Sequence, residues 1–255
     1  MPVLRRKGIA LHYEVYGEGP PLLLTHGYSA TGQMWEGQIA ALSRTHQLIL
    51  WDMRGHGRSD YPTDPEEYSE AATVADMAAI LDAVGAPRAV VGGLSLGGYM
   101  SLAFYLRYPE RVAALLIIDT GPGFKKDTAR AQWNETALAT ARDFEQRGLA
   151  RLQQATPEMR SSTHRDARGL ILAARGMLTQ RDDRVISHLP AISVPALVVV
   201  GAEDTPFLAA ADYMANKIPG AKRVVIPGAG HAVNIDQPHA FNAAVTDFLT
   251  AIEGR

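Results

Sequence analysis

The chain of 255 residues contains no cysteine. This absence excludes disulfide bonds, a thiolate nucleophile and metal sites with cysteine ligands. The chain also lacks a basic arm or stripe: its formal net charge is −2, with both signs interleaved, so we expect no nucleic-acid partner. No metal-ligand cluster, phosphate-binding loop or dinucleotide fingerprint is present in the sequence, and we therefore expect neither a metal nor another cofactor.

The sequence also shows no pattern typical of a secretion signal or of a membrane anchor. The first residues show no apolar core before a small-residue cleavage site, so we expect no signal peptide and a cytoplasmic location, although a signal removed earlier would leave the same pattern. One uncharged run, residues 89–106, is long enough to span a bilayer. Its four glycines disfavour a continuous helix, and a strand, a tight turn and a helix explain it better. We expect no membrane partner.

The overall composition is that of a folded globular protein. Apolar residues make up 47% and charged residues 20% of the chain, which is typical of globular proteins. Short apolar runs alternate with helical patterns, which predicts an α/β fold with a mostly parallel, eight-stranded sheet flanked by helices and an antiparallel edge at its start. The expected strands are a first strand near Arg5 and Arg6, then 9–16, 21–27, 46–52, 89–93, 113–121, 195–204 and 221–228; the expected helices are 31–44, 69–84, 96–109, 206–218 and 238–252.

One segment interrupts this alternation. Residues 124–188 contain no strand pattern, only helix-forming stretches such as Asp127–Arg147 and Gly169–Thr179. A helical insertion of this length after the sixth strand predicts a cap, or lid, over a sheet-containing core formed by residues 1–123 and 189–255. The alternative is an extra crossover of two helices.

The motif with the most chemical content is Gly93-Leu94-Ser95-Leu96-Gly97, a match to G-x-S-x-G. Five residues alone are a weak signal, but an apolar strand precedes this match and a helix follows it. Such a sharp strand-to-helix turn needs small residues two positions before and after the serine, and it exposes the hydroxyl at a helix N-terminus that favours an oxyanion. Ser95 is therefore the predicted nucleophile; the alternative is a glycine-rich helix start with an incidental serine.

A serine nucleophile needs a base, and His231 is the best of the eight histidines. It follows a late apolar strand in a glycine-flanked loop that can reach over the sheet. Asp204, at the end of the strand 195–204, is the predicted carboxylate that holds the histidine in the correct tautomer. Asp119 also ends a strand and is the rival for that role, whereas Asp236 is expected to begin the last helix.

The order Ser95, Asp204, His231, together with the turn and the insertion, resembles the α/β-hydrolase superfamily over nearly the whole chain. In that family a His-Gly motif precedes the second oxyanion donor. The match is His26-Gly27-Tyr28, so the resemblance implies that the backbone N–H groups of Tyr28 and Leu96 form an oxyanion hole. It also implies a structural role for the turn at residues 52–59.

Details of the motifs narrow the resemblance. A serine at the turn argues against the haloalkane dehalogenases and epoxide hydrolases, which use aspartate. The style of the turn and its helix is similar to that of small carboxylesterases and enol-lactonases. The expected function is thus hydrolysis of a small carboxylic ester through an acyl-serine; the alternatives are a lactonase or a C–C bond hydrolase with the same triad, and, more remotely, a ligand receptor without catalysis.

The sequence also suggests which residues meet the substrate. Apolar side chains of the predicted lid would line an acyl pocket for a small-molecule ester or lactone, although each has an alternative reading as packing within the lid. We expect a monomer or a homodimer. The candidate pocket residues are Trp133, Phe144, Leu170, Leu172 and Met177.

Overall fold

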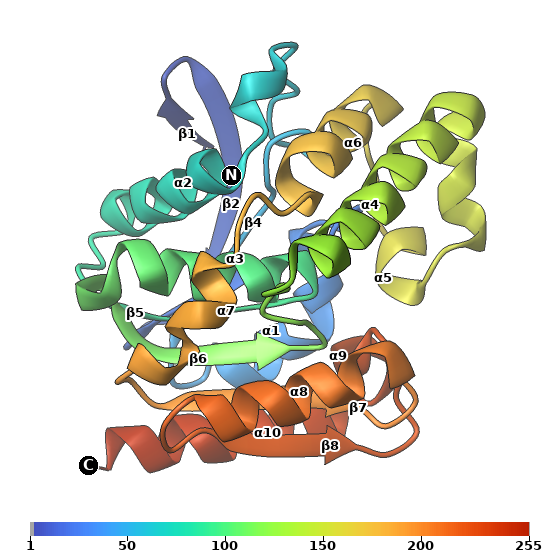
Figure 1. Ribbon diagram of the computed structural model, residues 1–255. Helices are drawn as coiled ribbons and strands as arrows, with labels where there is room; N and C mark the ends of the chain where they lie inside the picture. Colours follow the sequence, from blue (N-terminus) through green and yellow to red (C-terminus); the bar gives the residue numbers. More distant parts are fainter. Residues whose placement is uncertain (1–2, 255) are drawn as a thin grey trace.

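The computed structural model describes residues 3–254, which fold around one eight-stranded sheet (Figure 1). The strand order is β1-β2-β4-β3-β5-β6-β7-β8; β2 pairs antiparallel with β1 and β4, and all other neighbours pair parallel. This confirms the predicted fold class. The strands are β1 (Val3–Arg6), β2 (Ile9–Tyr16), β3 (Pro21–Thr25), β4 (Gln47–Trp51), β5 (Ala89–Leu94), β6 (Val112–Ile118), β7 (Ala196–Gly201) and β8 (Lys222–Ile226).

Helices cover both faces of the sheet, which explains why the central strands are apolar at consecutive positions. In β3, Leu23 packs toward the face that carries α2, α3 and α8, whereas Leu22 and Leu24 pack toward the face of α1 and α10. Short 3₁₀ turns precede or join several helices, as η1 (Gly32–Trp35) precedes α1. The helices of the core are α1 (Glu36–Leu42), α2 (Glu70–Ala83), α3 (Leu96–Arg107), α8 (Thr205–Lys217), α9 (Val233–Asp236) and α10 (Pro238–Glu253).

The segment between β6 and β7 contains only helices and turns in the described part of the chain. Figure 1 shows α4, α5 and α6 gathered beyond the carboxyl end of β6. This helical insert holds more than the two crossover helices of the alternative; that it acts as a lid, with the domain limits given above, stays a prediction, and residues 1, 2 and 255 of those limits lie outside the described residues. Its elements are α4 (Asp127–Arg147), η4 (Gly148–Gln154), α5 (Pro157–Arg160), α6 (Ala167–Ala173), the π-helical turn η5 (Ala174–Leu178), α7 (Arg184–His188) and η6 (Leu189–Ala191).

The uncharged run 89–106 forms β5, a turn at Ser95 and most of α3. None of the helices in residues 3–254 is long and apolar enough to cross a membrane.

Three histidines join the insert to the core. His26 and His56 are fully buried and His164 of the insert is 8% exposed, and their rings lie in a row, with centroids 5.0 Å apart for His26 and His56 and 5.7 Å apart for His56 and His164. Each ring bonds one backbone carbonyl and one backbone N–H. The pairs are His26 with Gly27 O (2.7 Å) and Met53 N–H (2.9 Å), His56 with Arg54 O (2.9 Å) and Ser29 N–H (3.2 Å), and His164 with Ser29 O (2.9 Å) and Gly57 N–H (3.2 Å).

These partners assign the protonation state of the three rings. A neutral imidazole has one donor and one acceptor nitrogen, which matches one carbonyl and one N–H per ring, whereas a charged ring would have no acceptor. Burial lowers the pKa of all three histidines, that of His26 to about 4. The row is therefore neutral near pH 7, and it fixes the loop from His26 to Ser29 against the insert.

A buried ion pair stabilises the turn at residues 52–59, which carries His56. The guanidinium of Arg54, which is fully buried, binds the carboxylate of Asp76 on α2 with Nε and Nη2, at 2.5 and 2.7 Å, and also contacts Glu67. The carboxylate of Asp52 accepts hydrogen bonds from the N–H groups of Gly32 (2.8 Å) and Arg58 (2.9 Å). The turn at residues 52–59 is thus held in place by charge-assisted bonds, in agreement with a structural role.

We predict that His164→Ala lowers the free energy of unfolding by about 1–3 kcal/mol at pH 8, because the Ser29 carbonyl and the Gly57 N–H lose their partner in a buried site. Urea denaturation measures this, with His239→Ala at the exposed start of α10 as the matched control.

The same pair of proteins has an expected pH dependence. The pKa of His164 is lower in the folded chain than the value of about 6.5 in the unfolded chain, so its stabilising effect is complete above pH 6.5 or so and is lost as the pH falls toward the folded-state pKa. The difference in stability between wild type and His164→Ala should shrink from pH 8 to pH 5. A constant difference would contradict a neutral, hydrogen-bonded His164.

Candidate active site

Ser95 lies in the sharp turn between β5 and α3, with φ 55° and ψ −118°. A residue other than glycine with positive φ is strained, and such strain is common at functional sites. Gly93 and Gly97 allow the turn, because a Cβ atom at either position would collide with the carbonyl oxygen of Thr25 at the end of β3. The Ser95 N–H donates to Ile118 O at 2.9 Å, which ties the turn to β6. The strand, turn and helix expected around Ser95 are present.

His231 and Asp204 lie together, although they are far apart in sequence. Asp204 follows β7 and is 5% exposed, and its Oδ2 atom lies 2.8 Å from Nδ1 of His231 in the loop after β8. This partner makes Nδ1 the donor nitrogen, so Nε2 is the acceptor in the neutral ring. The ring also stacks on Phe207, with centroids 5.1 Å apart.

The environment of His231 has opposing effects on its pKa. Burial lowers the pKa, but the hydrogen bond and the charge of Asp204 raise it, and the net direction is upward from the usual value of 6.5. An imidazolium formed during a reaction would therefore be stabilised at this position.

The rival carboxylate, Asp119, has other partners. Its two oxygens accept the N–H groups of Gly201 at 2.8 Å and Val233 at 3.3 Å, and burial raises the pKa of Asp119 to about 8. Asp119 therefore connects β6 to the segments that lead to Asp204 and follow His231. Asp236 ends α9 instead of beginning the last helix, and it accepts the Gly230 N–H at 2.9 Å.

The two backbone N–H groups predicted to form an oxyanion hole, those of Tyr28 and Leu96, are unbonded: among the described residues, neither donates to another protein group. The loop and the turn are adjacent, because a Cβ atom on Gly27 would lie 3.5 Å from Cβ of Ser95. The Tyr28 hydroxyl donates to Leu170 O of the insert at 2.8 Å, which fixes the loop to α6.

The Ser95 hydroxyl itself makes no hydrogen bond within residues 3–254. Serine–histidine contacts are often long without substrate and tighten when substrate binds. The hydrogen bond between Asp204 and His231 is thus present while the Ser95 hydroxyl is unbonded within the described residues.

A cavity of about 130 Å³ opens beside Ser95. Trp133 and Met177, two of the predicted pocket residues, line it; the structure does not place Phe144, Leu170 and Leu172 there. Its walls come from the turn (Ser95, Leu96, Tyr99), the segment after β6 (Thr120, Gly121, Pro122, Gly123, Phe124), the insert (Trp133, Met177, Leu178, Gln180) and the start of α8 (Pro206, Phe207, Ala210).

The other three predicted pocket residues pack inside the protein. Phe144 is 1% exposed, with its ring edge-on to Tyr28 at 6.2 Å between centroids, and Leu170 and Leu172 belong to the core cluster beneath the insert. An apolar residue on a helix does not reveal from sequence whether it faces a cavity or the core. Residues 120–124 were not among the predicted pocket residues, although their position at the carboxyl end of a strand is a signal that the sequence provides.

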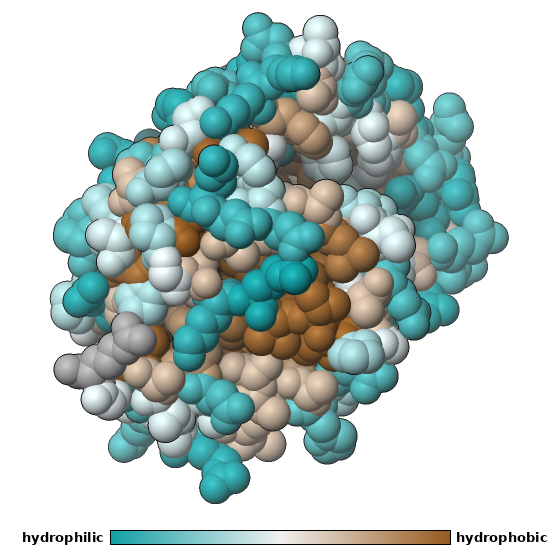
Figure 2. Space-filling model, turned by 60° about the horizontal axis from the view of Figure 1, so that its bottom comes forward, coloured by the Kyte–Doolittle hydropathy of each residue, from teal (hydrophilic) through white to brown (hydrophobic). Residues whose placement is uncertain are grey.

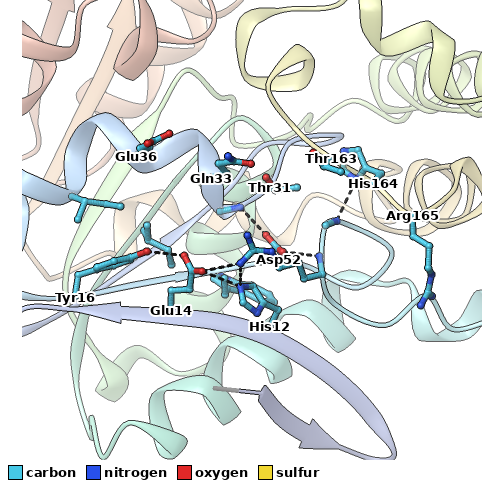
Figure 3. A pocket seen from close by; sticks show the side chains of 16 residues that line it. His12, Glu14, Tyr16, Thr31, Gln33, Glu36, Asp52, Thr163, His164 and Arg165 are labelled. Carbon is cyan, nitrogen blue, oxygen red and sulfur yellow. Dashed lines mark hydrogen bonds and ion pairs between the residues drawn. The ribbon is translucent and has the colours of Figure 1, made fainter. Parts of the chain in front are cut away.

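A larger hollow of about 650 Å³ lies away from Ser95, at the β2 side of the sheet. Figure 3 shows His12, Glu14 and Tyr16 along one wall and Gln33 and Glu36 opposite. Several of its polar groups bond one another: Glu14 accepts the Tyr16 hydroxyl at 2.8 Å and an N–H of Arg58 at 3.0 Å. The larger hollow contains none of the strained or unbonded groups described above. The smaller cavity beside Ser95 is therefore the candidate active site.

The surface on the face shown in Figure 2 is mostly hydrophilic, with one continuous apolar area near its centre. Such an area framed by polar residues is typical of a binding region.

Comparisons with known proteins agree with this fold. The chain is 31% identical, over 95% of its length and 96% of the relative's, to the putative 2-succinyl-6-hydroxy-2,4-cyclohexadiene-1-carboxylate synthase of Bacillus subtilis (strain 168). It is similar in structure to a thermophilic esterase from Thermogutta terrifontis, with TM-score 0.81, 30% identity and coverage of 98% of this chain and 97% of that one.

The enol-lactonase from Burkholderia xenovorans LB400 is similar as well, with TM-score 0.80, 28% identity and coverage of 98% of this chain and 100% of that one. The family described as alpha/beta hydrolase fold matches residues 20–165, more than half of the chain. The chain therefore belongs to the α/β-hydrolase fold family, and it is a hydrolase.

Proposed function

We propose that the protein is a serine hydrolase that cleaves a small carboxylic ester through an acyl-serine intermediate, with Ser95, His231 and Asp204 as its triad. The observation that carries this proposal is the strained turn, which presents the Ser95 hydroxyl to an apolar cavity beside two unbonded backbone N–H groups. The hydrogen-bonded pair of His231 and Asp204 supplies the base.

In the first half-reaction, Nε2 of His231 takes the proton of the Ser95 hydroxyl while Oγ attacks the ester carbonyl. The carbonyl oxygen becomes an oxyanion, which accepts hydrogen bonds from the N–H groups of Tyr28 and Leu96; each such donor contributes about 3–4 kcal/mol in the transition state. The intermediate collapses, the bond to the alcohol oxygen breaks, and His231 returns the proton to the leaving alcohol. Ser95 now carries the acyl group.

Water completes the cycle. His231 deprotonates a water molecule that attacks the acyl carbonyl, the same two N–H groups hold the oxyanion, and the proton passes to Oγ as the acid leaves. Asp204 stays ionised and stabilises the imidazolium in both halves. Both steps need His231 to be neutral at the start.

The size of the cavity indicates short acyl groups. Its volume of about 130 Å³ is close to that of cavities of roughly 150 Å³ that hold one benzene molecule. Aromatic and apolar side chains form most of its wall, so burial of methylene groups contributes to binding, at about 0.8 kcal/mol for each group.

A second candidate reaction is lactone hydrolysis, which the similarity to a protein named an enol-lactonase favours. The same attack on a cyclic ester leaves the alcohol attached to the acyl group. Parallel assays with open-chain esters and with γ- and δ-lactones of equal carbon number decide between the two by comparing kcat/KM.

We expect Ser95→Ala to lower kcat for p-nitrophenyl butyrate about a million-fold, because the acyl acceptor is removed. Acetate and butyrate esters should be faster than the octanoate, which exceeds the cavity. The alanine protein should keep the melting temperature of the wild type or exceed it, since the strained serine is not needed for folding. Activity that survives in Ser95→Ala would refute the nucleophile assignment.

Asp204→Asn should lower kcat roughly ten-thousand-fold through loss of the correct histidine tautomer. Because Asp204 raises the pKa of His231, and activity requires the neutral ring, the acidic limb of the kcat/KM profile should also move to lower pH.

The control for this variant is Asp119→Asn, which removes the rival carboxylate. We expect it to cost stability, about 1–3 kcal/mol, through the buried N–H groups of Gly201 and Val233, and to retain far more activity than Asp204→Asn. The opposite ranking of the two variants would transfer the acid role to Asp119.

A further inference from the structure

The cavity beside Ser95 contains little polar chemistry apart from the triad serine. The Tyr99 hydroxyl donates to Glu70 at 3.0 Å, and the Thr120 hydroxyl donates to the carbonyl of Ser95 at 2.7 Å, so both are already bonded. The side chain of Gln180 is different. Among the described residues its amide group makes no hydrogen bond, and its Oε1 atom is buried without a partner.

Gln180 as a whole is half-buried, but its Oε1 atom is buried. A buried amide oxygen without a partner is uncommon, because most buried polar atoms in proteins are hydrogen-bonded, and each exception calls for an explanation. An amide can present either its oxygen or its NH₂ group by rotation about the last side-chain torsion, so it can accept or donate. Apart from Ser95, Gln180 is therefore the polar side chain of this lining that makes no hydrogen bond within the described part of the chain.

The position of this amide is fixed by the insert. The side chain of Asn134 on α4 holds the backbone of Gln180 on both sides, with Nδ2 donating to Gln180 O at 2.9 Å and Oδ1 accepting the Gln180 N–H at 2.8 Å. The indole N–H of Trp133 donates to Leu178 O at 2.7 Å, two residues earlier. The segment that carries Gln180 is thus fastened to α4, and only the side chain is left to adapt to a ligand.

The absence of a side chain at Gly123 leaves room for the adjacent amide of Gln180. Gly123 has φ +91°, and a Cβ atom there would lie 2.9 Å from Oε1 of Gln180. A larger residue would therefore be strained in its backbone and would push the amide aside. This geometry keeps the Gln180 side chain at the wall of the cavity.

The charge of the wall sets a limit on the ligand. None of the residues that line the cavity is lysine, arginine, aspartate or glutamate. A carboxylate or ammonium group on the acyl chain would be buried without an opposite charge, which is strongly unfavourable. A keto or hydroxyl oxygen would not meet this penalty and would find a partner in Gln180.

We propose that Gln180 is a specificity-determining residue that binds a neutral oxygen group of the acyl chain, so that the protein prefers esters of short, uncharged keto or hydroxy acids over plain alkanoates and over half-esters of dicarboxylic acids. This inference rests on the proposed function of Ser95. It names what the acyl part of the substrate carries.

Three ethyl esters that differ only at the far end of the acyl chain test this: ethyl pentanoate, ethyl 4-oxopentanoate and monoethyl succinate. Acid release in a pH-stat measures their hydrolysis. In the wild type, kcat/KM for the 4-oxo ester should exceed that for the pentanoate by about three- to ten-fold, the effect of one neutral hydrogen bond. Monoethyl succinate should be the slowest, by at least about ten-fold relative to the pentanoate, because its carboxylate is unpaired.

The deciding variant is Gln180→Met, which keeps the length of the side chain and removes the amide. It should remove the preference for the 4-oxo ester, measured as the ratio of kcat/KM for the 4-oxo ester to kcat/KM for the pentanoate in the same protein. Gln132→Met on the exposed side of α4 is the matched control and should keep the wild-type ratios. If Gln180→Met melts early, Gln180→Leu serves for the same comparison.

Equal losses on all three esters in Gln180→Met, or an unchanged ratio, would overturn the role of Gln180, as would a wild type that accepts the succinate as well as the pentanoate. Each of those results leaves Ser95-dependent hydrolysis intact. Ester hydrolysis that is absent from the wild type, or that persists in Ser95→Ala, would instead overturn the proposed function and this inference with it.

Discussion

The contact between the Ser95 turn and the end of β3 is the constraint on which the site depends. The backbone of the turn lies so close to the Thr25 carbonyl that no side chain fits at Gly93 or Gly97. This approach brings the start of α3 next to the loop after β3, and with it two backbone N–H groups next to one hydroxyl. The strained torsion angles of Ser95 are a consequence of this contact, and the flanking sheet supplies the packing that maintains them.

Much of this arrangement could be predicted from the sequence, because it depends on local patterns. The helix at Asp127–Arg147 has the expected bounds, and the strands followed from short apolar runs between turn residues. The turn at Ser95 was identifiable because glycines, a strand and a helix occur together there. Backbone sterics and periodicity determine such features within about ten residues.

Other features depend on contacts across the fold and could not be predicted. The stretch 169–179 was expected to be an ordinary helix, yet it ends in a π-helical turn whose residue Gly176 packs directly on the backbone of Tyr68. Asp204 and Asp119 both end strands, and only the path of two loops decides which of them meets His231. His164 and Gln180 belong to no short sequence motif. The ring of His164 bonds Ser29, 135 residues away, and the backbone of Gln180 bonds Asn134, 46 residues away.

Three side-chain hydrogen bonds of the insert share one property. Tyr28 donates to the carbonyl of Leu170, His164 to that of Ser29, and Trp133 to that of Leu178. In each case a side chain binds a backbone oxygen, which every amino acid possesses. The accepting residues are thus free to change in evolution without loss of the bond, and Leu178, which lines the cavity, is one of them. Substitution at Leu178 can therefore change the shape of the cavity beside Ser95 while the bond from Trp133 that holds this segment to α4 is kept.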